Sequence, residues 1–452
     1  MADPHSALGR RDALLFVVAS GIGSFGLGVA AFYLNFLYRA LGFDEVAIGA
    51  LQGAQAVGGV VGAWPAARLA RSYSRRAAIL IGGVVSAAGI VGIVAVTSLG
   101  LQVVAALLLG AGGIVVYASG SALLSDATAS GDRPRRFGQQ IALGTIAGFL
   151  SAYIAGQLAN PIGASLGAPP SSLLVVRVLV AVGGIVAAAS ALPMLLVRAV
   201  LVPRGSLEAP VRRGLMLRFA VVEGVFGFGA GSFLPFVNLF FADRFGMSFG
   251  AIGIALGVIA VGGSLGALLH GIHVAPRLGQ LRGVVLVQLL SIPFALTAAI
   301  VPFGTAVVGV LAVRAGLMYG SSATYRAFEL SSFRPAERVG ASALLTIAWS
   351  GPAALGSVLS GTARDALGDV GWTLNIVTLA AAYIAGATLS LVFVAARSRS
   401  LGHTPRHDHD RARGDRVRVP CRDRPRGGRA RMARGRECGA GGRGAPRRPG
   451  AR

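Results

Sequence analysis

The chain has 452 residues, of which 54% are hydrophobic and 13% are charged, and its formal net charge is +24. A mean hydropathy of +0.69 excludes an ordinary soluble domain and indicates a membrane protein. All 42 basic residues are arginine, so the sequence has neither a P-loop lysine for ATP hydrolysis nor a Schiff-base lysine. Both cysteines lie near the C-terminus, which excludes a disulfide framework in the hydrophobic part.

A helix that crosses a membrane needs about 20 predominantly apolar residues. Stretches of this kind follow one another along the chain, at 13–38, 46–66, 77–97, 101–124, 138–158, 173–196, 217–241, 249–269, 283–302, 304–325, 339–360 and 372–395. We therefore predict an all-α membrane protein with twelve transmembrane helices.

The second and eighth predicted helices carry nearly the same sequence. AIGALQGAQAVGGVVGA at 47–63 and AIGIALGVIAVGGSLGA at 251–267 agree at ten of seventeen positions, five of them glycine. Just upstream, with the offset shifted by one position, Asn35 matches Asn238. Because six spans separate the copies, both have the same orientation, and we expect two parallel six-helix repeats. The glycines are expected to form close helix contacts.

This repeat predicts four parts: an N-terminal six-helix bundle at 12–196, a cytoplasmic linker at 197–216, a C-terminal six-helix bundle at 217–396 and a tail at 397–452. The tail holds 18 arginines against 5 acidic residues and is predicted to be disordered. Without the tail the net charge falls from +24 by 13 to +11, so the basic character does not indicate a nucleic-acid partner.

The arginines also predict the orientation of the chain. One set of loops holds sixteen arginines, whereas the opposite set holds only Arg39, Arg244 and Arg364. By the positive-inside rule, both termini are cytoplasmic, and the protein spans the inner (plasma) membrane several times.

Six plus six parallel spans with an arginine-rich loop after the second span resemble the major facilitator superfamily. The family's loop motif, Gly-x-Leu-Ala-Asp-Arg-x-Gly-Arg-Arg, corresponds to residues 67–76. Arg75 and Arg76 fit the motif, but Arg71 replaces its aspartate. The resemblance implies a monomeric secondary transporter for a small molecule, without a cofactor, in which Arg71, Arg75 and Arg76 belong to the loop that controls conformational change.

Polar residues inside spans are costly and therefore informative. Arg314 lies near the middle of the tenth span, and Met318, Ser321 and Tyr325 follow it on the same helical face. We expect this stripe to line water and, through Arg314, Met318 and Ser321, to bind substrate. The alternative is an arginine held by other protein groups with no role in binding.

The fourth span, the repeat partner of the tenth, offers Tyr117 and Ser121 as further substrate-binding candidates. The related pair Asn35 and Asn238 lies near the outer ends of the first and seventh spans. These asparagines are expected to bind substrate or to latch an outer gate. Hydrogen bonding between helices is the alternative for the pair, and also for Gln52.

Glu223 lies inside the seventh span, where carboxylates are scarce. A partly buried carboxyl group there is the first candidate for a proton carrier, and Asp126 at the cytoplasmic end of the fourth span is the second. A salt bridge from Glu223 to Arg218 or Arg326 is the alternative.

Together these features predict a proton-coupled transporter that exports small amphipathic compounds by alternating access. Uptake of an anionic solute held by Arg314 is the alternative. A membrane-embedded acyltransferase-like enzyme and a non-transporting receptor are further alternatives, the first supported only by an H-x4-D pattern at 403–408 in the tail. We expect no enzymatic activity, no cofactor and no metal site.

Overall fold

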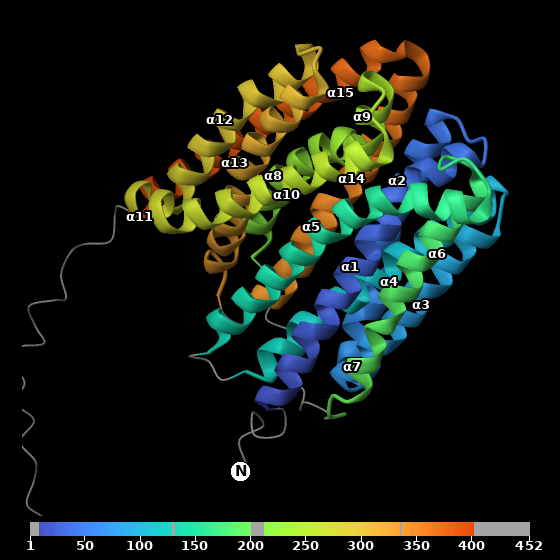
Figure 1. Ribbon diagram of the computed structural model, residues 1–452. Helices are drawn as coiled ribbons and strands as arrows, with labels where there is room; N and C mark the ends of the chain where they lie inside the picture. Colours follow the sequence, from blue (N-terminus) through green and yellow to red (C-terminus); the bar gives the residue numbers. More distant parts are fainter. Residues whose placement is uncertain (1–8, 129–131, 200–211, 335–336, 402–452) are drawn as a thin grey trace, which may run out of the picture. The chain divides into compact units, whose positions relative to one another are not determined.

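The computed structural model describes residues 9–128, 132–199, 212–334 and 337–401. Within these ranges the regular structure is helical and contains no strand (Figure 1). The contacts group the chain up to Ser400 into one compact unit. The core of the predicted linker, the H-x4-D pattern and the tail beyond residue 401 lie outside the described residues.

The first six spans are formed by seven helices, the last of which is a short continuation. They are α1 (Arg10–Ala40), α2 (Glu45–Ser72), α3 (Arg75–Ala95), α4 (Leu99–Asp126), α5 (Arg133–Leu166), α6 (Leu173–Ala189) and α7 (Ala191–Leu195). We call them the N-terminal bundle.

The next six spans contain two interrupted helices. They are α8 (Arg213–Phe233) with η2 (Leu234–Phe236) and α9 (Val237–Phe245), α10 (Phe249–Leu269) with η3 (His270–Val274) and α11 (Ala275–Leu278), α12 (Gln280–Ile300), α13 (Gly304–Ser331), α14 (Arg338–Leu367) and α15 (Asp369–Leu401). We call them the C-terminal bundle.

In the described part of the chain, twelve helical segments are long and apolar enough to cross a membrane. Each corresponds to one predicted span. The prediction of an all-α membrane protein with two parallel six-helix repeats is confirmed. The exact domain limits, 12–196 and 217–396, stay a prediction.

The turns before α2 and before α10 are built alike. Gly42 and Gly246 have positive φ angles of 84° and 60°, a conformation that glycine adopts without steric cost. Asp44 then caps α2, and Ser248 caps α10, each with a side-chain oxygen that accepts a backbone N–H. We call the end of the bundles that carries these two turns the α1–α2 end.

The first glycines of the repeated stretch join the two bundles. A Cβ atom on Gly49 of α2 would lie 2.6 Å from the carbonyl oxygen of Ser357 and 3.1 Å from Cα of Gly361, both in α14. In the other copy, a Cβ atom on Gly253 of α10 would lie 2.8 Å from Cα of Gly156 in α5. These helices touch backbone to backbone, and only glycine leaves room for the contact.

The later glycines of each copy pack within their own bundle, against α4 or α13. The pairs are Gly58 with Leu107, Gly62 with Ala111, Gly262 with Ala312 and Gly266 with Gly316. The repeated sequence therefore has two parts, one for contact between the bundles and one for packing inside each bundle. Figure 1 shows α14 beside both α2 and α8.

Candidate functional site

The seventh span is interrupted at Pro235, where α8 gives way to η2 and α9. Proline has no N–H, so it cannot bond to the carbonyl of Gly231 one helical turn earlier. The hydroxyl of Ser357 in α14 donates to that carbonyl instead, at 3.1 Å. Although the apolar sequence predicts one continuous helix over 217–241, the break leaves backbone groups for other partners.

Asn35 of α1 bonds to one of these groups, the carbonyl of Pro235, and also to Asn238 of α9. Asn35 donates through Nδ2 to the carbonyl of Pro235 at 2.7 Å and to Oδ1 of Asn238 at 2.9 Å. Asn238 donates in turn to the carbonyl of Phe32 at 2.9 Å. Gln52 of α2 donates to Oδ1 of Asn35 at 2.6 Å. Both asparagines are buried, so these bonds hold α1, α2 and the broken seventh span together.

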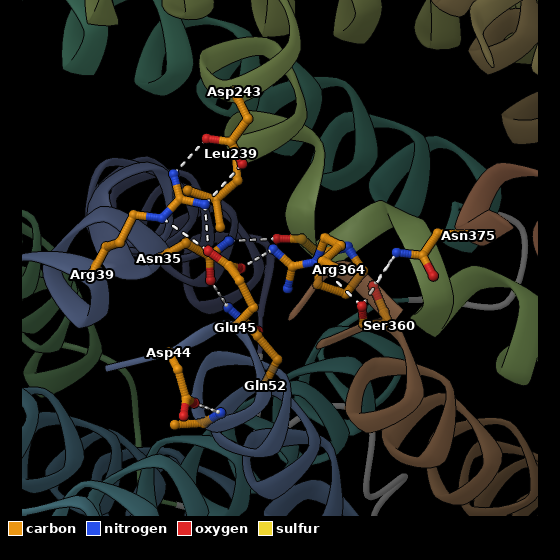
Figure 2. A network of polar contacts seen from close by, with 12 residues as sticks. Asn35, Arg39, Asp44, Glu45, Gln52, Leu239, Asp243, Ser360, Arg364 and Asn375 are labelled. Carbon is orange, nitrogen blue, oxygen red and sulfur yellow. Dashed lines mark hydrogen bonds and ion pairs between the residues drawn. The ribbon is translucent and has the colours of Figure 1, made fainter. Parts of the chain in front are cut away.

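Four charged side chains lie beside the asparagines at the α1–α2 end (Figure 2). Arg39 of α1 donates to both carboxylate oxygens of Asp243 in α9, at 2.5 and 2.8 Å. The same guanidinium donates to Glu45 of α2 at 2.5 and 3.1 Å. Glu45 also pairs with Arg364 of α14. Two arginines and two carboxylates thus balance, and Glu45 bridges the two arginines.

Arg364 is the most buried member of this group, with only 2% of its side chain exposed. Its guanidinium carbon lies 4.3 Å from the ring centre of Phe236 and 4.8 Å from that of Trp372. The aromatic faces stabilise the cation, and the Glu45 carboxylate supplies the opposite charge. The asparagines, Glu45, Arg364 and their partners are called the gate network below.

The predicted stripe on the tenth span faces the interior of the C-terminal bundle. Arg314 of α13 is only 6% exposed, and its guanidinium carbon lies 5.6 Å from the ring centre of Tyr383 in α15. No acceptor among the described residues reaches its Nε. Met318 and Ser321 are buried too, and the Ser321 hydroxyl donates to the Met318 carbonyl. The stripe is thus buried in this structure, and its role in lining water and binding substrate stays a prediction.

Glu223 of α8 is buried. Its carboxyl group lies within hydrogen-bonding reach of Glu329, and the nearby cation is Arg326. Arg326 donates to Glu329 at 3.3 Å and to the hydroxyl of Thr346 in α14 at 3.1 Å. Of the two salt-bridge partners expected for Glu223, the structure brings Arg326 near it.

Asp126 ends α4 and pairs with Arg75 at the start of α3, at 3.0 Å. Arg76 donates to the carbonyl of Val197, just after α7, at 3.0 Å. These contacts hold helix ends together at the end opposite the gate network. The side chain of Arg71 lies outside the described residues. Asp126 therefore has its own cation.

Tyr117 of α4 is 69% exposed, and Ser121 one turn later is half-buried. Tyr319 of α13 is also exposed and covers Gly263 of α10. Neither tyrosine takes part in the gate network.

A model of the Major Facilitator Superfamily matches residues 14–357, which is most of the chain. The chain belongs to the Major Facilitator Superfamily. It is a multi-pass secondary transporter, and members of this superfamily bind small-molecule substrates, are typically monomeric and are generally not enzymes. No curated protein matches the chain at the level of sequence.

Solved structures with the superfamily fold are similar over most of their length. A variant of the nucleoside transporter NupG is 16% identical, with a TM-score of 0.65, over 84% of this chain and 99% of that chain. A bacterial homologue of the human lysosomal transporter Spinster, inward-facing and occupied, is 17% identical, with a TM-score of 0.64, over 85% and 96%. The same homologue in its unoccupied form has a TM-score of 0.64 at 16% identity, over 90% and 100%. At these identities the likeness shows the fold alone.

Sequence reasoning missed several residues of this superfamily member's site. The sequence marks Arg39 and Arg364 only as rare arginines of the outside loops, and the predicted site includes neither Glu45 nor Asp243. One signal was available, because Arg39 and Asp243 follow the repeated asparagines at spacings of four and five. Glu329, near the end of α13, was missed too.

Proposed function

We propose that this chain exports small amphipathic molecules in exchange for protons, and that the gate network is its outer gate. The observation that carries the proposal is the joining of the bundles at one end. The gate network links α1 and α2 to α9 and α14, and Gln157 of α5 donates to the carbonyl of Gly250 in α10 at 3.2 Å. These contacts between the bundles close the protein at this end, and alternating access requires them to break.

The chemistry of the gate network suits reversible closure. Partly exposed ion pairs contribute only about 0.2–1 kcal/mol each, because water solvates the charges almost as well when they separate. A shift of a two-state equilibrium from 1:99 to 99:1 needs about 5.5 kcal/mol. The partly exposed pairs of Arg39 with Glu45 and Asp243 therefore resist opening only weakly, and the buried pair of Arg364 with Glu45 is the stronger contact. The arginine distribution supports assigning this end to the outside.

Uncharged aromatic side chains support an amphipathic solute. Tyr117, Tyr153, Tyr319 and Trp349 are exposed on α4, α5, α13 and α14. We propose that Tyr117 and Tyr319, with Ser121, contact the solute. Arg314 is only 6% exposed beside Tyr383, which makes uptake of an anionic solute the second candidate.

Glu223 is our proposed proton carrier, because it is a buried carboxyl group that forms no direct ion pair with any described residue. Asp126 is the less favoured candidate, since Arg75 holds it at 3.0 Å. Protonation and release at Glu223 would then bias the bundles between their two arrangements.

The test uses purified protein in proteoliposomes with an imposed pH gradient and an internal pH-sensitive dye. A panel of neutral amphipathic compounds is screened for proton flux that depends on the added compound. We expect such flux in the wild type and in Asp126→Asn. Glu223→Gln is expected to keep compound binding, measured as thermal stabilisation, but to lose coupled flux. Undiminished coupled flux in Glu223→Gln would refute its role, and a wild type without flux for any compound would refute the proposed function.

A further inference from the structure

Two buried carboxyl groups from different helices meet in the C-terminal bundle. Glu329 of α13 is 0% exposed, and Glu223 of α8 is 9% exposed. Arg326 reaches Oε2 of Glu329 at 3.3 Å, whereas no N–H or O–H donor of the described residues reaches Oε1. The Glu223 carboxyl lies within hydrogen-bonding reach of Glu329. Two carboxylates cannot bond to each other, so this contact becomes a hydrogen bond only when one of them carries a proton.

The balance of charges around the two glutamates also favours one bound proton. Arg326 is the cation that acts on both carboxyl groups. Part of its donor capacity goes to α14, to the Ser342 carbonyl at 3.2 Å and the Thr346 hydroxyl at 3.1 Å. With both carboxyl groups ionised, the cluster would hold an excess negative charge in a medium of low dielectric. One proton between the carboxyl groups removes this excess.

Among the residues that the structure describes, the other titratable neighbours do not supply a second cation. Tyr325 of α13 lies near both glutamates, and its hydroxyl is 3.5 Å from that of Ser390 in α15. Tyr383 of α15 also lies near Glu223, but it is covered by Arg314. Arg314 thus contacts the Tyr383 ring, and Arg326 is the cation that lies near the two glutamates.

We propose that Glu223 and Glu329 share one proton and together form the proton-binding site of this transporter, with Arg326 as its fixed positive charge. The inference rests on the proposed function and adds Glu329 as the second half of the site. Asp126 at the end of α4, the other candidate carboxyl group, forms an ion pair with Arg75. The proposed proton site therefore lies in the C-terminal bundle.

The pair is connected to the gate network by shared elements. The seventh span carries Glu223 in α8 and Asn238 and Asp243 in α9. Helix α14 carries Thr346, which Arg326 contacts, and Arg364, which pairs with Glu45. When the shared proton is lost, Arg326 faces two carboxylates. Their attraction competes with the hydrogen bonds from Arg326 to Ser342 and Thr346 of α14. This competition transmits the protonation state to the helix that closes the gate.

The test is infrared spectroscopy of the purified full chain at neutral pH, in H2O and in D2O, which detects the C=O stretch of a protonated carboxyl group. We expect a solvent-isotope-sensitive band in the wild type. The band should vanish in Glu223→Gln and equally in Glu329→Gln, because the remaining carboxylate pairs with Arg326. Asp126→Asn is the matched control and should keep the band.

A band that survives either single substitution, or a wild type without such a band, would overturn the shared proton. Circular dichroism checks that each variant is folded. If one single variant does not fold, the double variant Glu223→Gln/Glu329→Gln replaces it in the test. Retention of the band in the double variant would also overturn the shared proton. Coupled flux that persists in Glu329→Gln but is lost in Glu223→Gln would overturn the pair and leave the proposed function standing. Loss of the band in both single variants, with no coupled flux in the wild type, would support the pair and remove the proposed function.

Discussion

Asn35 and Asn238 join the two bundles through a side-chain hydrogen bond of 2.9 Å, although 203 positions separate them in the chain. They occupy equivalent places in the two repeats, so each copy of the duplicated sequence contributes one partner to the same contact. The two residues therefore lie where the first span and its repeat copy, the seventh span, approach each other. A duplication has produced a self-complementary contact between its own halves.

Asn35→Ala should favour opening at the α1–α2 end. It removes the hydrogen bonds from Asn35 to Asn238 and to the carbonyl of Pro235, and a buried acceptor left without a donor costs about 1–3 kcal/mol. Gate opening can be measured as the labelling rate of Ile252→Cys, a fully buried position on α10, after Cys421→Ser and Cys438→Ser. We expect faster labelling in Asn35→Ala than in the parent protein, and equal rates would argue against the latch.

Glu45→Gln should open the gate more than Asp243→Asn. Glu45 is the carboxylate partner of the buried Arg364, and loss of one member of a buried pair costs about 3–5 kcal/mol. In the described part of the chain, Asp243 forms an ion pair only with the more exposed Arg39, and such pairs contribute about 0.2–1 kcal/mol. The same Ile252→Cys labelling assay ranks the two variants, and a larger effect of Asp243→Asn would contradict the assigned contacts.

Gly361→Ala should separate α14 from α2. Its Cβ atom would lie 2.3 Å from the carbonyl oxygen of Glu45 and 3.1 Å from Cα of Gly49, and backbone cannot move aside cheaply. Gly351→Ala on the same helix is the control, because nothing lies within 4 Å of its Cβ position. We expect increased Ile252→Cys labelling for Gly361→Ala alone. An unchanged rate would mean that this glycine contact does not close the gate.

Arg314→Met should preserve compound binding and leave the thermal midpoint unchanged or higher. The arginine is buried and its Nε has no acceptor among the described residues, so a volume-conserving apolar replacement removes an expensive charge. Arg314→Ala should lower the midpoint, because it leaves a cavity. If Arg314→Met is stable but no longer binds any transported compound, the original assignment of Arg314 to the substrate site is correct.

The sequence predicts the spans well because lipid demands long apolar helices, and the duplication shows in the paired glycines and asparagines. The break at Pro235 was hidden, since hydropathy does not register a missing N–H. Helical spacing correctly puts Arg314, Met318 and Ser321 on one face, but spacing does not identify the neighbour of that face. The pair of Glu45 with Arg364 spans 319 positions, and one sequence contains no signal that connects them.

The most direct test of the account is the distance between spin labels at Gln157→Cys and Gly250→Cys, which flank the α5–α10 contact at the gate end. Double electron–electron resonance is recorded in the cysteine-free background, with and without Glu45→Gln, over a range of pH and with a transported compound. We predict a short distance for the closed gate and a second, longer distance whose population rises in Glu45→Gln and changes with pH or compound. A single short distance under every condition, in the variant as in the parent, would contradict alternating access through this gate.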